Sequence, residues 1–190
     1  MTDEIKIEIH GLEELTRLLD EFGNLEEAVY FPLREAMSQA VQLIEARAKQ
    51  NLTDNASVAS GALRAMGVGS NVEVTPTALT GIVYADIRRN GVNYAEAVEF
   101  GTRKGYIPPL EPLIEWVRLK GLTGVVTLAR GRLKRARQQS AIEQLARQVQ
   151  WGIYYHGTAA RPFFEPAVEA SRAEILQLFE DAVTQIIAHL

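Results

Sequence analysis

The sequence contains no cysteine, so the chain can form neither a disulfide framework nor a thiolate metal site, which fits folding in a reducing cytoplasm. Its three histidines, His10, His156 and His189, lie far apart and lack the i, i+4 spacing of a zinc-binding helix. No Gly-x-Ser-x-Gly elbow occurs, and Gly67-Val68-Gly69 lacks the third glycine of a dinucleotide-binding loop. We therefore expect no catalytic residue, no cofactor and no metal ion, and hence a protein that is not an enzyme.

Long apolar runs and a strong charge of either sign are also missing. The chain opens with Met1-Thr2-Asp3-Glu4 instead of an apolar export signal, and no run approaches the ~20 apolar residues of a membrane helix. The formal net charge is only −4, whereas domains that wrap nucleic acid by bulk electrostatics are usually basic. We expect no membrane contact, and contact with DNA only in passing.

The apolar content is sufficient for one core. Of the 190 residues, 47% are hydrophobic, which suits a single domain over residues 1–190. Three prolines punctuate the start of the long stretch between Thr102 and Arg161, and helical spacing follows them. We interpret about 108–156 as a helical insertion in that domain.

Alternating hydrophobicity predicts the strands. Ile5, Ile7 and Ile9 alternate with polar residues, as in a half-buried strand. Residues 68–74 and 79–87 alternate in the same way on either side of a short proline-containing turn. These segments predict a small, mainly antiparallel sheet that contains a hairpin.

Apolar residues at spacings of three and four predict five helices. They cover about residues 12–23, 26–52, 113–121, 133–155 and 166–189. The second is long, and it tolerates Pro32 if its first turn begins there. Residues 53–60 are small, polar and aperiodic, which predicts a mobile loop. The expected fold class is α+β, with a long helix packed on the small sheet, a helical insertion and a C-terminal helix.

Two distant stretches stand out by their composition. Residues 94–102 combine aromatic, small and acidic side chains before a glycine turn at Gly101, and their spacing leaves helix and strand equally open. In residues 161–167, two prolines bracket two phenylalanines and stiffen the approach to the last helix. We expect Glu99 to pair with Arg161, because a guanidinium suits a carboxylate bidentately, and the pair would tie the stretches together. The residues that we expect to contact a partner are Tyr94, Glu96, Glu99, Phe100, Gly101, Arg161, Phe163 and Phe164.

These stretches also carry a family resemblance. Ser60-Gly61-Ala62-Leu63-Arg64, then residues 94–102, then residues 161–167, are similar to three signature blocks of a family of tail components of long-tailed bacteriophages. Residues 9–15 resemble the start of that family. Its members are described as tail-completion, tail-terminator or head-tail joining proteins, and related ones occur in prophages and phage-like particles. In the shortest members the last two blocks lie close together, whereas here residues 108–156 intervene.

The resemblance implies a structural virion protein without catalytic residues. It would complete the tail or join it to the head by assembling as a homo-oligomeric ring, a hexamer in this family. Its partners would be the tail tube protein or head-tail connector proteins. Its place would be the tail or neck of the virion, after assembly in the host cytoplasm. We expect a monomer in isolation that assembles only on such a template.

A basic run supports an alternative from another class. It lies within residues 130–137 and consists of Arg130, Arg132, Lys134, Arg135 and Arg137. Such a run is typical of a small nucleic-acid-associated or regulatory binding module. Because the overall charge balance is acidic, a solvated helix face or a contact with an acidic subunit explains the run better, and no aromatic residue interleaves it.

Overall fold

Three strands form an antiparallel sheet in the order β1-β3-β2. The structure is a computed structural model that describes residues 3–9, 25–55, 63–75, 78–89, 92–121 and 132–189. Strand β1 (Asp3–Ile9) pairs with β3 (Leu79–Ala85), which also pairs with β2 (Val68–Val74). The N-terminal strand and the hairpin are therefore confirmed, although β3 ends two residues earlier than expected.

One face of this sheet carries the core. Along β3, alternate residues are buried and the residues between them are more exposed, which is the period of a strand with one covered face. Helix α2 (Leu25–Asp54) lies across this buried face. A Cβ added to Gly81, in the central strand, would lie 2.5 Å from Met37 Sδ and 2.6 Å from Val41 Cγ1. Gly81 therefore allows α2 to approach the middle of the sheet closely.

Helix α2 begins earlier and ends later than its sequence indicates. It starts at Leu25, one residue before the expected start, so Pro32 lies inside the helix and the condition that its first turn begins at Pro32 is not met. The packing of Val29, Leu33 and Met37 into the core compensates for the helical hydrogen bond that proline cannot make. At the other end, α2 includes Thr53 and the residue after it, which the sequence predicts as loop. The remainder of that loop and the helix expected over 12–23 lie outside the described residues.

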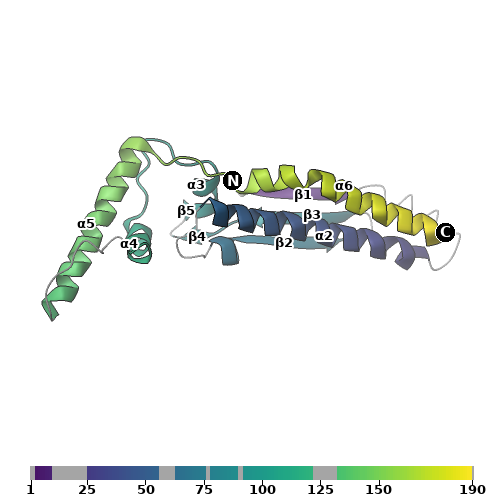
Figure 1. Cartoon of the computed structure of the whole chain (residues 1–190), viewed down its shortest axis with the longest axis horizontal. Coiled ribbons are helices and arrows are strands. Elements are labelled where there is room, and N and C mark those ends of the chain that lie inside the picture. Colours follow the sequence, from purple (N-terminus) through teal and green to yellow (C-terminus); the bar gives the residue numbers. More distant parts are fainter. Residues whose placement is uncertain are drawn as a thin grey trace.

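Helix α6 (Phe164–His189) runs beside α2 and completes the body of the molecule (Figure 1). Its buried residues include Ala167, Ala182 and Ile186, which join α2 and the sheet in one hydrophobic cluster. The fold of the described residues is α+β, as the sequence predicts. A π-helical turn, η1 (Leu63–Gly67), precedes β2, and a two-stranded ribbon, β4 (Arg88–Arg89) with β5 (Val92–Asn93), precedes the short helix α3 (Tyr94–Glu99).

Two helices project from one end of the body (Figure 1). Helices α4 (Leu110–Leu119) and α5 (Arg132–His156) pack against each other around their own small cluster of Val117, Ile142 and Ala146. We call residues 103–156 the arm and the rest of the described chain the body. Within the part of the chain that the structure describes, the segments on either side of the arm connect it to the body, so these segments help to determine how the arm is held.

Candidate functional site

The first stretch singled out in the sequence forms helix α3. Asn93 caps it: its side-chain oxygen accepts a hydrogen bond of 3.0 Å from the backbone N–H of Ala95. Gly101 follows with φ +71°, so the glycine turn that the sequence indicates is confirmed. Since the helix ends at Glu99, the turn directs the following chain away from the body and into the arm.

The carboxylate of Glu99 caps the last helix from a distant part of the chain. Its Oε2 accepts hydrogen bonds from the backbone N–H groups of Phe163 (2.7 Å) and Phe164 (3.0 Å), and its Oε1 accepts one from Glu165 (3.0 Å). These groups begin α6, whose first N–H groups have no partner within the helix and carry the positive end of its dipole. Glu99 is only 5% exposed, so the carboxylate replaces water at this helix end.

The expected ion pair between Glu99 and Arg161 is therefore wrong, although the two stretches do meet. The backbone N–H of Arg161 donates to Val98 O at 2.8 Å, and its guanidinium Nη1 donates to Asn55 O at 3.3 Å. Asn55 O lies just beyond the C-terminal end of α2, where a cation interacts favourably with the helix dipole. Arg161 thus lies near the end of one helix while Glu99 caps the start of another.

Residues 94–102 and 161–167 thus meet in what we call the junction. Two asparagines at the C-terminal end of α2 complete it, and sequence reasoning missed them. Asn51 Nδ2 donates to Phe163 O, and Asn55 Nδ2 donates to Pro162 O, each at 2.9 Å. In the sequence, Asn51 and Asn55 are notable only because each begins an Asn-x-Ser/Thr pattern. The signal that identifies them is their spacing of four, which places both amides on one side of the helix.

Two glycines allow the chain segment that enters the arm and the segment that leaves it to lie directly against each other. We call this contact the crossing. Thr102 and Thr158 form an antiparallel bridge in which each backbone N–H donates to the other residue's carbonyl at 3.2 Å. A Cβ on Gly101 would lie 2.3 Å from Thr158 O, and one on Gly157 would lie 2.2 Å from Thr102 O. Both glycines also have positive φ, so no side chain fits at either position without moving the backbone.

The eight residues predicted to contact a partner divide by burial. Glu99, Phe163 and Phe164 are buried, and the two phenylalanine rings meet edge to face with centroids 6.2 Å apart. They support the junction from inside. Exposed side chains are those of Glu96, Phe100 and Arg161, while Tyr94 is half-buried and Gly101 forms the crossing. Phe100 is 61% exposed, which is unusual for a phenylalanine and makes it available to a partner. Contact with a partner stays a prediction for all of them.

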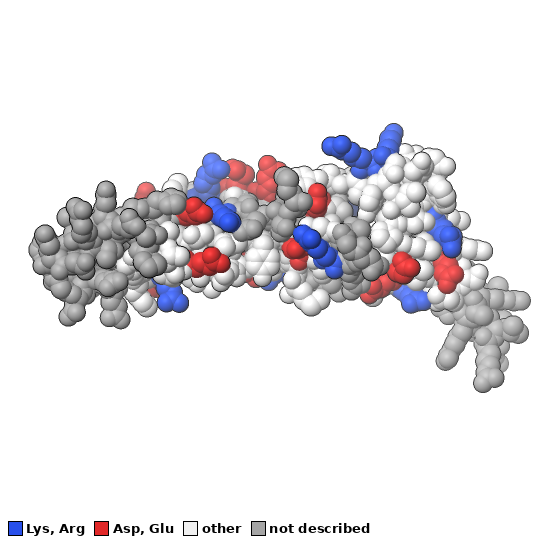
Figure 2. All heavy atoms as spheres, turned by 180° about the vertical axis from the view of Figure 1, so that it is seen from behind, with Lys and Arg blue, Asp and Glu red and all other residues white. Residues whose placement is uncertain are grey.

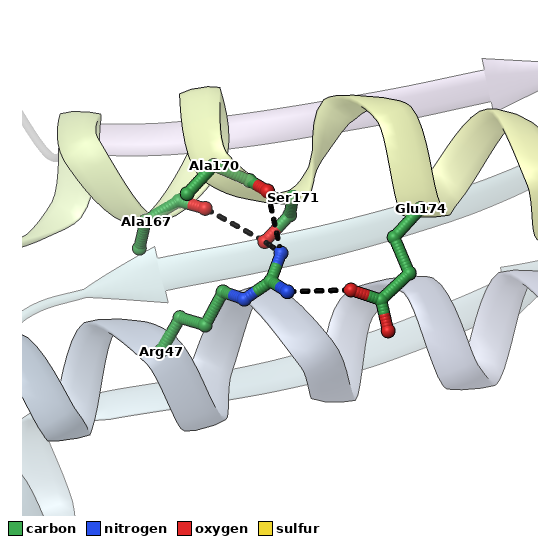
Figure 3. A network of polar contacts seen from close by, with 5 residues as sticks. All are labelled: Arg47, Ala167, Ala170, Ser171 and Glu174. Carbon is green, nitrogen blue, oxygen red and sulfur yellow. Dashed lines mark hydrogen bonds and ion pairs between the residues drawn. The ribbon is translucent and has the colours of Figure 1, made fainter.

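A polar network holds α6 against α2 beyond the junction (Figure 3). Arg47 Nη1 donates to Ala170 O at 2.7 Å and to Ser171 Oγ at 2.9 Å, and its Nη2 pairs with Glu174. The fully buried Ser171 hydroxyl donates in turn to Ala167 O at 2.7 Å. The network gives the buried Ser171 hydroxyl its hydrogen-bond partners. Because it joins one residue of α2 to three residues of α6, it also helps to fix the register between the two helices.

Among the described residues, the pKa values of the Glu45 carboxyl and the Tyr106 hydroxyl are shifted. Burial raises the pKa of the Glu45 carboxyl, but hydrogen bonds from Lys49 and Ser70, together with the charge of Lys49, outweigh burial and leave the pKa below its ordinary value. Burial alone raises the pKa of the Tyr106 hydroxyl, which has no hydrogen-bond partner within the part of the chain that the structure describes. Glu45 joins α2 to the sheet, and Tyr106 lies where the chain enters the arm.

The basic run begins helix α5, except for Arg130, which lies outside the described residues. Its side chains are likewise not described. Within residues 3–9, 25–55, 63–75, 78–89, 92–121 and 132–189, no three His, Asp or Glu side chains are grouped as metal ligands would be. In the same residues no helix has the length and apolar character needed to cross a membrane.

Comparisons with known proteins found no family model, no curated protein and no solved structure that matches this chain.

Proposed function

We propose that this chain is a structural protein of a bacteriophage tail or neck, which completes the tail or joins it to the head by assembling as a ring. The proposal starts from the four sequence segments that resemble, in order, those of phage tail components. One structural observation supports it most: the second and third of the three signature blocks, more than fifty residues apart in sequence, meet in one junction around Glu99. The resemblance therefore concerns a folded unit.

The chemistry of that junction suits support and docking. Its buried carboxylate is fully engaged by three backbone N–H groups, which leaves it no role as an acid, a base or a nucleophile. Beside this rigid support lie Glu96, Phe100 and Arg161, an acidic, an aromatic and a basic side chain that all face solvent. Aromatic and arginine side chains are enriched at the centres of protein interfaces.

Ring assembly requires a heterologous interface, in which one face of each copy meets a different face of the next. Strands β1 and β2 are the outer strands of the three-stranded sheet that the described residues form, so each offers a sheet edge to which a strand of another chain could be added. We expect a monomer in isolation, with the tail tube or a head-tail connector as the template on which copies join.

Binding to the proteins of the particle tests the proposal. The chain should co-purify with tail tubes or with portal-side connector proteins of its own gene cluster. Phe100→Ser should weaken that binding by about tenfold or more, because exposed aromatic anchors at interface centres contribute at least ~1.4 kcal/mol. Phe31→Ser is the matched control, because Phe31 is 66% exposed on α2, away from the junction. Retention of neither partner, or equal loss with both variants, would contradict the proposal.

The alternative of a nucleic-acid-associated module is favoured by one observation, the charge of the arm. Residues 103–156 hold ten Lys and Arg against three Asp and Glu. Retained affinity for duplex DNA at about physiological salt, with no binding to tail proteins, would favour this alternative.

A further inference from the structure

We infer that the arm of one copy docks on helix α6 of a neighbouring copy. This contact would be a heterologous interface of the assembly, in addition to any contact through the outer strands. It rests on that part of the proposed function in which copies of the chain associate, and it adds which surfaces meet. Two exposed apolar patches at different places in the molecule, and the opposite net charges of the segments that carry them, support the inference.

The arm presents an aromatic cluster. Trp151 and Tyr155 lie one helical turn apart on α5 and stack with ring centroids 5.9 Å apart, and Tyr154 meets both rings edge to face. Trp151 is 51% and Tyr155 61% exposed, so their faces are open to solvent. Rigid rings that are already stacked lose little entropy on binding, which makes such a cluster a strong anchor.

The segment that enters the arm fixes this cluster in place. Gly105 donates its backbone N–H to Tyr154 O at 2.8 Å, and Gln150 Nε2 donates to Pro108 O at 2.7 Å. Ile107, between these two attachments in the entering segment, is 56% exposed and adds apolar area. The cluster therefore lies on a braced surface, which preserves its shape in the free chain.

Helix α6 presents the second patch. Leu176, Val183 and Ile187 recur at spacings of seven and four, so they lie along one side of the helix, and each is between 47% and 65% exposed. Their neighbours in sequence are acidic, since Glu180 and Asp181 separate the first from the other two. We call these three residues the α6 stripe. An apolar stripe exposed to this extent marks an interaction surface.

Charge favours contact between the arm and the body of different copies. In the sequence, residues 103–156 include ten basic and three acidic residues, whereas the remaining residues include ten basic and twenty-one acidic ones. Helix α6 alone has five acidic residues and one arginine. On the face shown in Figure 2, most acidic side chains lie on the body, and a wide area of the arm bears neither sign of charge. A basic arm is thus attracted to an acidic body and repelled by another arm.

The geometry makes this contact intermolecular. The arm leaves the body near the N-terminal end of α6 (Figure 1), whereas the α6 stripe extends from the middle of that helix to near its C-terminal end. At 1.5 Å per residue, the stripe extends from roughly 18 Å to roughly 35 Å beyond the start of α6. The aromatic cluster lies at the end of α5 that adjoins the body, and α5 points away from α6 (Figure 1). The cluster of one copy can therefore reach the stripe only on another copy.

The patches are small, which predicts a weak contact. A few half-exposed side chains on each side bury less than the ~1,200 Å² of a stable interface. The contact should therefore be transient in solution and persist only where a template holds several copies together. This is consistent with a chain that stays monomeric until it meets its partner.

Photo-crosslinking of the full chain tests the inference. A photoreactive phenylalanine analogue at position 151 is irradiated in a concentrated equal mixture of isotope-labelled and unlabelled chain. We expect crosslinks between copies that end in residues 173–187. Crosslinks only within one copy, or to any other surface of a second copy, would overturn the inference. The sequence has no cysteine, so paired cysteines at Tyr155 and Ile187 provide an independent check by disulfide trapping between copies.

Two variants establish that the interface is heterologous. Tyr155→Ser removes an anchor from the arm, and Leu176→Asn with Ile187→Asn removes the stripe. Each should lower crosslinking between its own copies at least about tenfold. A mixture of the two should regain crosslinks in one direction, from the intact arm of the stripe variant to the intact stripe of the arm variant. No recovery in the mixture, with both variants folded by circular dichroism, would overturn the inference.

Two controls distinguish a specific contact between copies from general adhesion of apolar side chains and from nucleic-acid binding by the arm. Leu119→Ser changes another exposed apolar residue of the arm and should leave crosslinking unchanged, whereas an equal loss would overturn the inference. Duplex DNA of mixed sequence is added at about physiological salt, and if it abolished the crosslinks by occupying the arm, the arm would be a nucleic-acid surface and the inference would fall.

The outcomes also distinguish the contact between copies from the proposed function. Crosslinks between copies without any binding to tail proteins would support the inference while contradicting the proposed function. Binding to tail proteins without such crosslinks would do the reverse.

Discussion

Replacement of Glu99 tests how the two distant stretches are joined. The substitution Glu99→Gln keeps the size of the side chain but removes its charge and turns one acceptor into a donor. One of the two groups of N–H donors, either Phe163 and Phe164 or Glu165, would then face an NH₂ group inside the protein. The N-terminal end of α6 would lose hydrogen bonds at a site that water does not reach.

The magnitude follows from the three hydrogen bonds. A hydrogen bond to a charged group contributes about 1.5–3 kcal/mol, but three bonds to one carboxylate are not additive, and the burial of its charge offsets part of them. We therefore expect Glu99→Gln to lower the free energy of unfolding by about 3 kcal/mol. For a chain of this size the melting temperature should fall by roughly 6–12 °C. Glu99→Ala should cost at least as much, because it adds a small cavity.

Chemical and thermal unfolding followed by circular dichroism measure the effect, and Arg161→Ala is the matched comparison. The Arg161 guanidinium is exposed and makes one 3.3 Å hydrogen bond to a backbone oxygen, so its loss should cost less than about 1 kcal/mol. An ion pair between the two residues would make the two variants equally destabilising. Equal losses, or a loss below about 0.5 kcal/mol for Glu99→Gln, would refute the capping account.

Three further predictions concern the crossing and the body. Gly101→Ala should lower the free energy of unfolding by more than about 3 kcal/mol. Gly105 also has positive φ, but a Cβ there would have no neighbour within 4 Å, so Gly105→Ala should cost about 1 kcal/mol. Equal melting temperatures of the two variants would contradict this prediction. Arg47→Met should cost about 1–2 kcal/mol in urea unfolding, most of it from the bonds to Ala170 and Ser171, since the partly exposed ion pair is screened, and the effect should change little between low and high salt. The pKa of Glu45 is below its ordinary value of 4.5, so its contribution to stability is complete above that value and disappears as pH falls through the folded-state pKa; the stability gap to Glu45→Gln should therefore shrink between about pH 7 and about pH 3, and a constant gap would contradict it.

The sequence predicted the elements well where one side of an element is buried. Alternation identified β1 and the hairpin of the body, and helical spacing identified α6 of the body and α5 of the arm, because these patterns follow directly from which face is covered. The start of α2 was predicted to within one residue, but the local rule that proline suits only the first turn of a helix did not hold. Val29 and Leu33 bury apolar surface on either side of Pro32, and the helix continues through it.

The junction was predicted in outline and missed in its chemistry. Composition indicated that residues 94–102 and 161–167 belong together, and a basic residue opposite an acidic one invited an ion pair. The donors that Glu99 binds in the fold are instead main-chain N–H groups, and the letters of a sequence do not show where backbone N–H groups lack partners. The roles of Asn51 and Asn55 were missed for the same reason, since both amides bind carbonyl oxygens.

Electron microscopy of particles assembled without this chain is the most direct test of the central claim, that it is a structural component of a phage tail or neck. The account predicts tails that remain unjoined to heads or exceed their normal length, and recovery when the intact chain is supplied. Supply of Phe100→Ser should restore fewer complete particles than supply of Phe31→Ser. Complete, normal particles in the absence of the chain would contradict the account.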